Sequence, residues 1–385
     1  MKNTEVKNKK QIVRRPDARK ISNPGLIPNI ILICAFTALI AFLEINKSTY
    51  SYQISTMEKA AVYAVVAVSM NLLTGFTGLF SLGQAGFMAI GAYTVAIFTI
   101  PVHNRASVYY VSGISSLIAN IQMPFWVALL LGGLLTAGIA ALIGIPVLRL
   151  KSDYLAIATL GFSEIIRALI SAPQLNRITN GSFGLKSIPT FPNLFVFFGI
   201  VILCIGLMVF LINSSYGRVF KAIREDEVAA ESMGINLFHY KELSFVISSF
   251  FTGVGGGLLA MFMRSIDSKT FQVTLTYEIL LIVVLGGVGS VTGSILGSFL
   301  ITFGREWLRF FDEPLVIGGF SVPLFRTGFR MVVFSVLLMV VVLFHREGLM
   351  GSREYSWAGF VRWIKSFPKR FFPKKSSSQK GGTQS

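Results

Sequence analysis

Nine long apolar stretches constrain what this chain can fold into more than any other feature. They lie at roughly residues 27–44, 58–75, 83–100, 124–148, 153–171, 193–212, 243–263, 277–304 and 328–344. A helix needs about 20 apolar residues to cross the hydrocarbon core of a bilayer, and each backbone group there must be hydrogen-bonded within its own segment. The sequence therefore predicts an all-α fold, a polytopic bundle of membrane helices.

The charges are few and lie mainly at the two ends. Only 14% of the 385 residues are charged, against about a quarter in soluble domains, and 53% are hydrophobic. Residues 1–20 and 345–385 carry net charges of +6 and +7, which make up most of the total of +17. These cations flank apolar spans and do not cover a folded module. The preference of positively charged loops for the cytoplasm explains their position, so no nucleic-acid partner is expected.

The basic ends also predict a topology. If both are cytoplasmic, the number of crossings is even, and the loop at 213–242 is cytoplasmic as well. The last stretch, 328–344, must then enter from outside, so the stretch at 277–304 must begin and end on the same side. Its 28 residues are too few for two crossings but enough for two half-helices. We therefore expect about eight full spans plus a re-entrant helix pair, with both termini in the cytoplasm.

The sequence GGVGSVTGSILG at 286–297 is the expected break between these half-helices. Gly286, Gly287, Gly289 and Gly293 allow the backbone to turn and the two helices to approach closely. A dinucleotide-binding loop after a strand is the alternative, because the glycine spacing comes close to a Gly-x-Gly turn. No GxxxxGK[ST] sequence occurs in the chain, so we do not expect a nucleotide enzyme.

A second glycine cluster occurs in MNLLTGFTGLFSLGQAGFMAIGAY at 70–93. It predicts a short bent junction, either on a translocation path or at a tight helix contact, and the sequence leaves both interpretations open. A polar contact between helices is the simpler role for the asparagine in this stretch, and a substrate contact is the other. The residues assigned to this junction are Asn71, Gly75, Gly78, Ser81, Gly83 and Gln84.

The chain offers no convincing catalytic site or metal site. His103, His239 and His345 are far apart, and no cluster of His, Cys and carboxylate residues has the spacing of metal ligands. Cys34 and Cys204 lie within apolar runs, where packing is their expected role. We therefore expect no enzymatic activity, no metal and no cofactor bound by this chain.

Glu164 and Arg167 stand three residues apart on the stretch at 153–171. Unpaired charge is expensive in a membrane, so we expect the two side chains to pair. The pair could face the interior of the bundle and orient helices or touch a pathway. The simpler interpretation is a structural pair near the outer end of the span.

The polar loop at 213–242 has the pattern of a short, capped helix. Residues from Gly217 to Met233 favour a helix, Gly234 is a natural C-terminal stop, and Asn236 can cap the helix that follows. A solvated connector would explain the charges of this loop but not the caps.

This loop resembles the coupling segment of the membrane permeases of ABC importers, which has an E-A-A-x-x-x-G pattern. Ala229, Ala230 and Gly234 match it, although Val228 stands at the first position and Glu227 one residue earlier. The stretch is similar to the D-E-x-A-A-E-x-M-G-I-N form of branched-chain amino acid permeases, which begins here at Asp226. Residues 71–93, 152–184 and 285–297 resemble the same family in the same order, and the larger of its two permease types is the nearest.

The resemblance implies a subunit of a transporter in the bacterial inner membrane. Its partners would be a second homologous permease, two cytoplasmic ATP-binding subunits and an extracytoplasmic solute-binding protein, and the ATP would bind to the partners. Leucine, isoleucine and valine are the expected solutes, with urea, short amides and nucleosides as alternatives. The residues expected to dock on an ATPase are Asp226, Glu227, Ala229, Ala230, Glu231 and Gly234.

Two other classes of protein remain possible on the sequence. A secondary transporter would carry ion-coupling carboxylates near the middle of the membrane, but the only candidates, Glu164 and Glu278, lie nearer the ends of spans. A structural membrane anchor would need neither the glycine break nor the capped loop. The expected parts are a basic arm (1–26), a transmembrane permease domain (27–344) and a basic tail (345–385), whose residues 354–372 form an interfacial helix before a disordered end.

Overall fold

The computed structural model describes residues 26–111, 113–150 and 152–309, and the short pieces 316–317, 320–321, 332–336, 339, 343 and 348–351. One compact unit spans Ile40–Tyr355, and a smaller one combines the two ends of the chain. The expected basic arm before residue 26, the interfacial helix at 354–372 and the end of the tail lie outside the described residues. Of the expected last span, the described residues at 332–336, 339 and 343 are helical.

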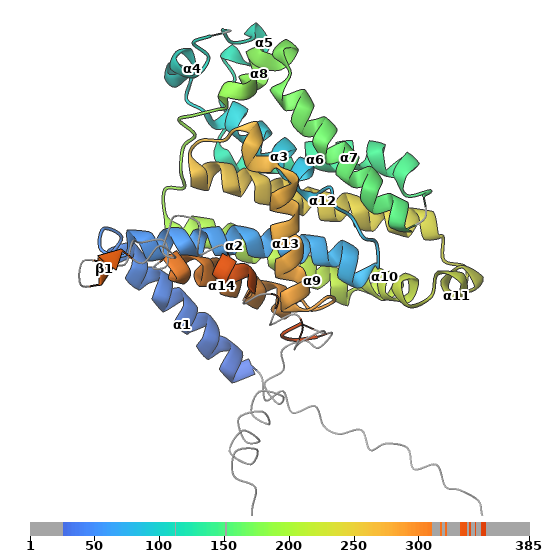
Figure 1. Ribbon diagram of the computed structural model, residues 1–385. Helices are drawn as coiled ribbons and strands as arrows, with labels where there is room; N and C mark the ends of the chain where they lie inside the picture. Colours follow the sequence, from blue (N-terminus) through green and yellow to red (C-terminus); the bar gives the residue numbers. More distant parts are fainter. Residues whose placement is uncertain are drawn as a thin grey trace, which may run out of the picture. The chain divides into compact units, whose positions relative to one another are not determined.

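The described chain is almost entirely helical (Figure 1). The α-helices are α1 (Leu26–Ile45), α2 (Ser51–Asn71), α3 (Gln84–Thr99), α4 (Val102–Val108), α5 (Ser116–Ala119), α6 (Phe125–Val147), α7 (Ser152–Ser171), α8 (Asn176–Thr179), α9 (Leu194–Asn213), α10 (Ser215–Glu225), α11 (Glu227–Ser232), α12 (Leu237–Met263), α13 (Val273–Gly286) and α14 (Val291–Trp307). The shorter elements are the π-helix η1 (Leu72–Phe76), the 3₁₀ turns η2 (Pro173–Leu175), η3 (Gly181–Phe183) and η4 (Ser268–Phe271), and an antiparallel pair of two-residue strands, β1 (Val316–Ile317) and β2 (Phe320–Ser321).

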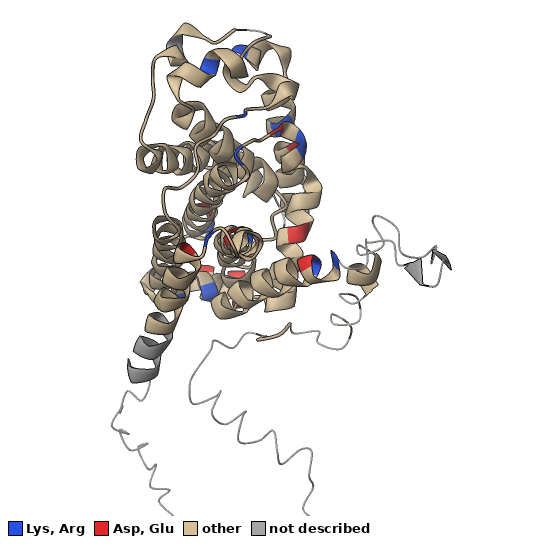
Figure 2. Ribbon diagram, turned by 90° about the vertical axis from the view of Figure 1, so that its left-hand side faces the viewer, with Lys and Arg blue, Asp and Glu red and all other residues tan. Residues whose placement is uncertain are grey.

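Five of the described helices are long and apolar enough to cross a membrane. They are Ser51–Phe76, Phe125–Val147, Tyr154–Ser171, Leu194–Asn213 and Leu237–Met263, and the pair α3 and α4, bent by 119°, makes a sixth if it counts as one span. Most of the ribbon in Figure 2 is uncharged, because these helices carry few ionisable residues. The all-α membrane bundle predicted from the apolar stretches is confirmed, whereas the number of eight spans stays a prediction.

The helices α2 and α12 form the centre of the larger unit (Figure 1). In their most apolar windows, 89% of the residues around α2 and 78% of those in α12 are buried inside the chain. The corresponding shares for α6, α7 and α9 are only 39%, 33% and 39%. These outer helices therefore present apolar faces that lipid or a partner must cover, as expected for a membrane bundle in which the lipid-facing side is as apolar as the core.

Backbone contact at glycines brings α3, α6 and α12 together. A Cβ atom added at Gly91 of α3 would lie 2.0 Å from the carbonyl oxygen of Gly253 in α12, and one at Gly256 would lie 2.1 Å from that of Met88. A Cβ at Gly253 would in turn meet the Thr136 side chain of α6 at 2.3 Å. Small residues therefore set the distance between these helices, as in other membrane bundles where close packing drives association.

Buried hydroxyl groups add a polar link between α2, α3 and α12. The hydroxyls of Ser69 and Thr252 are 2.8 Å apart, and Thr252 donates to the side-chain oxygen of Gln84 at 2.6 Å. The hydroxyl of Ser248 donates to the backbone oxygen of Ser69 at 2.6 Å. All four side chains are almost fully buried, so the link ties together three central helices at groups that have no access to water.

Arg105 holds the end of the unit at which α4 and α5 lie. Its side chain is 3% exposed, in a segment for which the sequence offered no interpretation. The guanidinium donates to the backbone oxygens of Ile97, Ile100, Ile118, Ala119 and Ile121. The five donors of an arginine suit such a cluster of carbonyl groups, and here they connect α3, α4 and α5.

The glycine contacts predict a difference between two alanine substitutions. Gly91→Ala should lower the free energy of unfolding by about 1–3 kcal/mol or more, because the added methyl group meets the backbone of α12. Gly138→Ala is the matched control, since nothing lies within 4 Å of a Cβ at that exposed position of α6. Thermal unfolding of the two variants in detergent compares them, and equal midpoints would contradict the proposed contact.

Candidate functional site

The helix α13 ends at Gly286 and α14 begins at Val291, so the break predicted within 286–297 is confirmed. Gly287 and Gly289 have φ angles of 123° and 88°, which side chains rarely allow. The hydroxyl of Ser290 accepts a hydrogen bond from the Gly293 amide at 3.1 Å and caps α14. Helices precede and follow the break, so a dinucleotide-binding loop after a strand is excluded.

The ends of this break are stabilised by contact between its two helices and by one later segment of the chain. A Cβ at Gly286 would lie 2.2 Å from the carbonyl oxygen of Gly293, so α13 and α14 touch backbone to backbone. The amides of Leu349 and Met350 donate to the oxygens of Leu285 and Gly286 at 2.8 and 3.1 Å. The last carbonyl groups of α13, which have no partner within the helix, are therefore paired.

Asn71, at the end of α2, fills the inside of the break with a fully buried amide. Its oxygen accepts from the Gly289 amide at 2.8 Å. Its nitrogen donates to the backbone oxygen of Ser290 at 2.9 Å and to the hydroxyl of Ser294 at 2.7 Å, with a longer contact of 3.3 Å to the oxygen of Gly287. A single side chain thus pairs the Gly289 amide away from water and adds a donor to the Gly287 and Ser290 oxygens, which also accept from the amides of Ser290 and Ser294.

The π-helix η1 follows Asn71 directly and packs on the same break. A Cβ added at Gly75 would lie 1.8 Å from the side-chain oxygen of Asn71 and 2.4 Å from the Gly289 nitrogen. The two glycine clusters of the sequence therefore meet backbone to backbone. Single π turns inside α-helices are frequent at functional sites, because they let a helix change direction without losing its hydrogen bonds.

The remaining residues assigned to the junction belong to a different contact. Ser81 is fully buried, and its hydroxyl accepts from the Gly83 amide at 3.4 Å. Gly83 precedes α3, and Gln84 lies in the hydroxyl network of α2, α3 and α12. Gly78 has a φ angle of 81° and lies against Arg224, with which a Cβ would be in contact at 3.1 Å. The predicted set is therefore divided between the helix break and the centre of the bundle.

The polar loop at 213–242 forms two short helices rather than the single helix expected from Gly217 to Met233. Asp226, with φ −159° and ψ 112°, separates α10 from α11. Its carboxylate accepts from the amides of Val228 and Ala229 at 2.9 and 3.0 Å. The expectation was wrong because this side chain offers the backbone an N-cap, which competes with continuing the helix.

The predicted ends of this segment are confirmed. Gly234 has a φ angle of 85°, and the amide of Ile235 reaches back to the oxygen of Ala230 at 3.2 Å, as in a glycine-terminated helix. The side chain of Asn236 accepts from the amide of His239 at 3.1 Å and caps α12. Rigid caps at both ends give α11 a fixed position at the tip of the loop.

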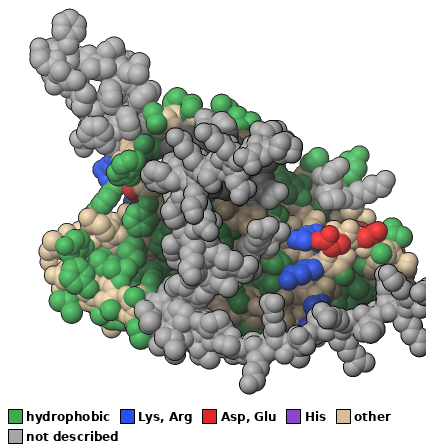
Figure 3. Space-filling view, turned by 90° about the horizontal axis from the view of Figure 1, so that it is seen from below, with side chains coloured by type: hydrophobic (Ala, Val, Ile, Leu, Met, Phe, Trp, Pro, Cys, Tyr) green, Lys and Arg blue, Asp and Glu red, His purple; other side chains and the backbone are tan. Residues whose placement is uncertain are grey.

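The surface of α11 is exposed and mixed in character. Val228 and Met233 are 74% and 83% exposed, and Ala229 is exposed, whereas Ala230 packs inward and is 4% exposed. Glu227 is paired with Lys241 at 2.6 Å. Figure 3 shows charged side chains gathered on the side of the molecule where Figure 1 places α10 and α11.

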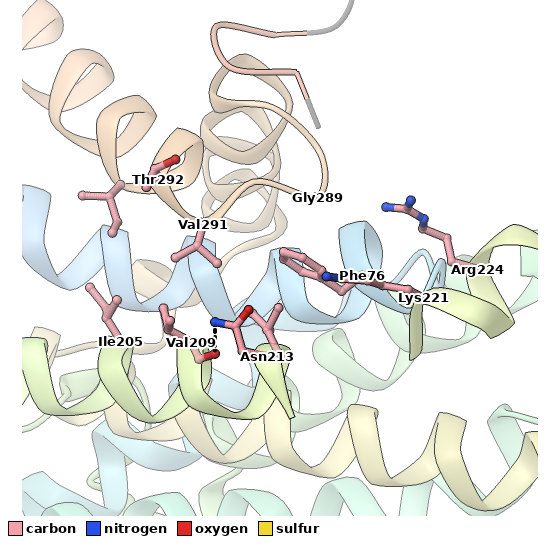
Figure 4. Close-up of a pocket in the computed structure, with 11 residues that line it drawn as sticks. Phe76, Ile205, Val209, Asn213, Lys221, Arg224, Gly289, Val291 and Thr292 are labelled. Atoms are coloured by element: carbon pink, nitrogen blue, oxygen red, sulfur yellow. Dashed lines mark hydrogen bonds between the residues drawn. The ribbon is translucent and has the colours of Figure 1, made fainter. Parts of the chain in front are cut away.

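A cavity of about 540 Å³ lies beside the break, between α9, η1, α10 and α14 (Figure 4). Its walls combine aliphatic side chains of α9 and α14 with Phe76 from η1 and Gly289 from the break. Lys221 and Arg224 contribute the cations, and the Lys221 ammonium lies 5.5 Å from the centre of the Phe76 ring. The volume falls in the range of small-molecule sites, and the cavity adjoins one side of the break.

The charged residues expected in the spans are paired. The guanidinium of Arg167 is 2.6 Å from the carboxylate of Glu164, and both side chains are about one third exposed. Glu278 of α13 forms an ion pair with Arg305 of α14. Among the described residues there is no group of His, Cys and carboxylate residues that could hold a metal.

The two cysteines are both free thiols. Cys204 is buried in α9, as its apolar surroundings predicted, whereas Cys34 is exposed. Packing within this chain therefore accounts for only one of them.

Reasoning from the sequence missed Arg224 as a member of this site. In the sequence, Arg224 is one of several cations in a polar loop. Nothing in the neighbouring residues indicates that it contacts Gly75, which lies 149 positions earlier. Ser294 was missed for the same reason, because only its position one turn into α14 brings it to Asn71. A glycine on each side of the contact, Gly75 and Gly289, was the available signal, but the sequence did not pair them.

The comparisons with known proteins match the sequence of this chain to a family. Residues 53–343 match the model of the permease component of branched-chain amino acid transport systems, a range that contains the break, η1, α10 and α11. The chain belongs to this family. This permease is similar to the high-affinity branched-chain amino acid transport system permease protein LivM of Salmonella typhimurium, with 36% identity over 71% of the chain and 67% of that protein. It is similar to LivM of Escherichia coli at 35% identity over 68% of the chain and 65% of the relative.

The chain thus spans about two thirds of the length of these two relatives. It also resembles the probable branched-chain amino acid transport permease protein LivH of Methanocaldococcus jannaschii, with 25% identity over 52% of the chain and 62% of that protein. No solved structure matches the chain. The family and the apolar helices together make this permease a multi-pass membrane protein.

The environment of Asn71 predicts a large effect of Asn71→Leu. The change keeps the volume but leaves the buried Gly289 amide without its hydrogen-bond acceptor, at a cost of about 1–3 kcal/mol, whereas the Ser290 oxygen keeps its bond from the Ser294 amide. We expect a lower thermal midpoint and faster hydrogen exchange at residues 287–290. Asn46→Leu is the control, because among the described residues that half-buried side chain bonds only within its own turn, to the oxygen of Phe42. Unchanged exchange in Asn71→Leu would show that the amide does not hold the break.

Proposed function

We propose that this permease forms the translocation path of an importer for the branched-chain amino acids leucine, isoleucine and valine. The support is the family match over residues 53–343, together with relatives of more than one third identity that are named as high-affinity branched-chain amino acid permeases. The solute crosses the membrane through this subunit and a second permease. A permease for urea, short amides or nucleosides is the alternative within the same class.

The partners in this proposal are a second homologous permease, two cytoplasmic ATP-binding subunits and an extracytoplasmic solute-binding protein. Likeness to both LivM and LivH supports a pair of homologous permeases, because the two named types are related to each other through this chain. The weakly buried faces of α6, α7 and α9 leave room for such a subunit. ATP is hydrolysed by the partners, so this chain binds no cofactor and catalyses no reaction itself.

The docking site for an ATPase in this proposal is the tip formed by α11. A rigid helix that carries exposed apolar side chains on a charged loop is well suited to a groove on another protein, since its caps fix its position before binding. This tip is formed by Asp226, Glu227, Ala229, Glu231 and Gly234. The buried Ala230 packs the tip against the rest of the chain. The contact converts the closure of the nucleotide-binding subunits into movement of the spans.

The topology of the proposal has α10 and α11 in the cytoplasm, together with both basic ends of the chain. About eight full spans and the re-entrant pair α13 and α14 cross or enter the inner membrane of a bacterium. The contact of Gly286 with Gly293 supports a pair of half-helices that turn back on each other at the break.

The pairing of charges weighs against a secondary transporter. Such a carrier needs a carboxylate that binds and releases an ion or a proton near the middle of the membrane. Glu164 and Glu278, the two candidates, are each neutralised by an arginine, Arg167 and Arg305 respectively. We therefore assign these ion pairs a structural role.

Purification of the permease from its native membrane in mild detergent tests the proposal. We expect an ATPase and a second permease to remain bound, and we expect the complex in liposomes, with its binding protein, to take up leucine only when ATP is supplied. Uptake by the isolated chain without ATP would instead identify a self-sufficient carrier. Competition by isoleucine, urea and a nucleoside separates the possible solutes.

Val228→Glu should separate the permease from its ATPase. The side chain is 74% exposed on α11, so a carboxylate there disturbs no internal packing but places a charge in the proposed docking groove. We expect about tenfold less ATPase to co-purify, equivalent to about 1.4 kcal/mol. Val111→Glu is the control, because that side chain is exposed near α4, at the other end of the unit. Equal co-purification of both variants would contradict docking at α11.

A further inference from the structure

We infer that Arg224 is the positioning residue that transmits movement of the polar loop at 213–242, which carries α10 and α11, to the break between α13 and α14. The inference rests on the proposed function and adds to it the route by which the ATPase acts on the spans. Arg224 lies in the last turn of α10, two residues before the N-cap of α11. Any tilt of α11 therefore moves Arg224 with it.

The guanidinium of Arg224 bridges two segments that are far apart in the sequence. It donates to the backbone oxygen of Gly75 in η1 at 2.7 Å. A Cβ at Gly289 would lie 3.0 Å from the same nitrogen, so the guanidinium also lies against the break. The neighbouring Glu225 accepts from the other guanidinium nitrogen at 2.5 Å, which fixes the orientation of the side chain.

The oxygen that Arg224 binds belongs to the part of α2 that departs from α-helical geometry. In η1 the hydrogen-bond pattern widens to a π turn, and Gly75 contacts the Asn71 side chain on one side and the Gly289 backbone on the other. Asn71 in turn binds residues 289, 290 and 294. A continuous set of hydrogen bonds and close backbone contacts therefore runs from α10 through η1 to the start of α14.

The cavity beside the break gives this set of contacts room to move. It is lined by Phe76, Arg224 and Gly289, and Figure 4 shows Arg224 at one end of the lining residues and Ile205 of α9 at the other. The opposite side of α2 is packed at Ser69 against α12 and cannot yield in the same way. A push on α10 thus displaces η1 and the break toward this cavity rather than against the core.

A missing side chain at Gly78 lets α10 come close enough for this contact. A Cβ there would meet the Cγ and Cα of Arg224 at 3.1 and 3.3 Å, and its φ angle of 81° disfavours any other residue. The loop after η1 is therefore shaped around the backbone of Arg224. The contact of Gly78 with the stem of Arg224 and the bond of the guanidinium to Gly75 make α10 and η1 move as one body.

Arg224→Gln in the assembled transporter tests the inference. We expect the variant to retain its ATPase and to hydrolyse ATP, but to take up about tenfold less leucine for each ATP hydrolysed, since a bond from a charged donor shifts an equilibrium by about that factor. Nucleotide should change hydrogen exchange at residues 287–290 in the wild type and not in the variant. Arg224→Lys, which keeps a charged donor, should restore part of the uptake.

Arg218→Gln is the matched control, because Arg218 is exposed on the same helix and bonds only to the neighbouring Ser215 hydroxyl at 2.8 Å. It should transport as the wild type does. The inference is overturned if Arg224→Gln moves as much leucine per ATP as the wild type, or if Arg218→Gln is equally uncoupled. A wild-type complex that takes up no leucine with ATP would instead overturn the proposed function.

Discussion

The structure of this permease depends on one buried amide, that of Asn71. A helix pair interrupted within the bundle exposes backbone groups that have no water to bind, and each would cost a substantial part of the stability of the chain. Asn71 pairs these groups from a neighbouring helix, with Ser294 as a further partner. Its position in the centre of the bundle means that the break can form only when α2 and α14 are packed together.

The same requirement explains why the central helices are so rich in small residues. Asn71 reaches the break only because η1 touches it directly at Gly75 and Gly289, without intervening side chains. Small side chains in the rest of the bundle, as at Gly91 and Gly256, hold α3 and α12 at the same short separation. Van der Waals contact and buried hydrogen bonds, rather than the hydrophobic effect, therefore hold this membrane protein together.

The arrangement separates a rigid half from a yielding half. On the side of α12, Ser69, Thr252 and Gln84 connect three helices through buried hydrogen bonds. On the side of α9, a cavity adjoins η1 and the break. A transporter driven by partner subunits needs both properties, because a force is transmitted only when one part of the bundle holds still while another moves.

The proposed docking tip joins this yielding half from outside the bundle. Asp226 both ends α10 and starts α11, so the direction of the tip is set by one side chain. The binding surface itself is small and consists of apolar groups surrounded by charge. Such a surface suits a partner that binds and dissociates repeatedly. A permanent interface usually has a large apolar core instead.

The sequence by itself determined the class of fold, the place of the break and the caps at Gly234 and Asn236, because each follows from local requirements on apolar length, φ angles and backbone pairing. It did not divide the loop at Asp226, since helix propensity and capping compete there. Only the tertiary structure decided that Asn71, Gly75, Arg224 and Gly289 meet. The reason is that a contact across more than a hundred residues depends on how whole helices pack, which no local pattern records.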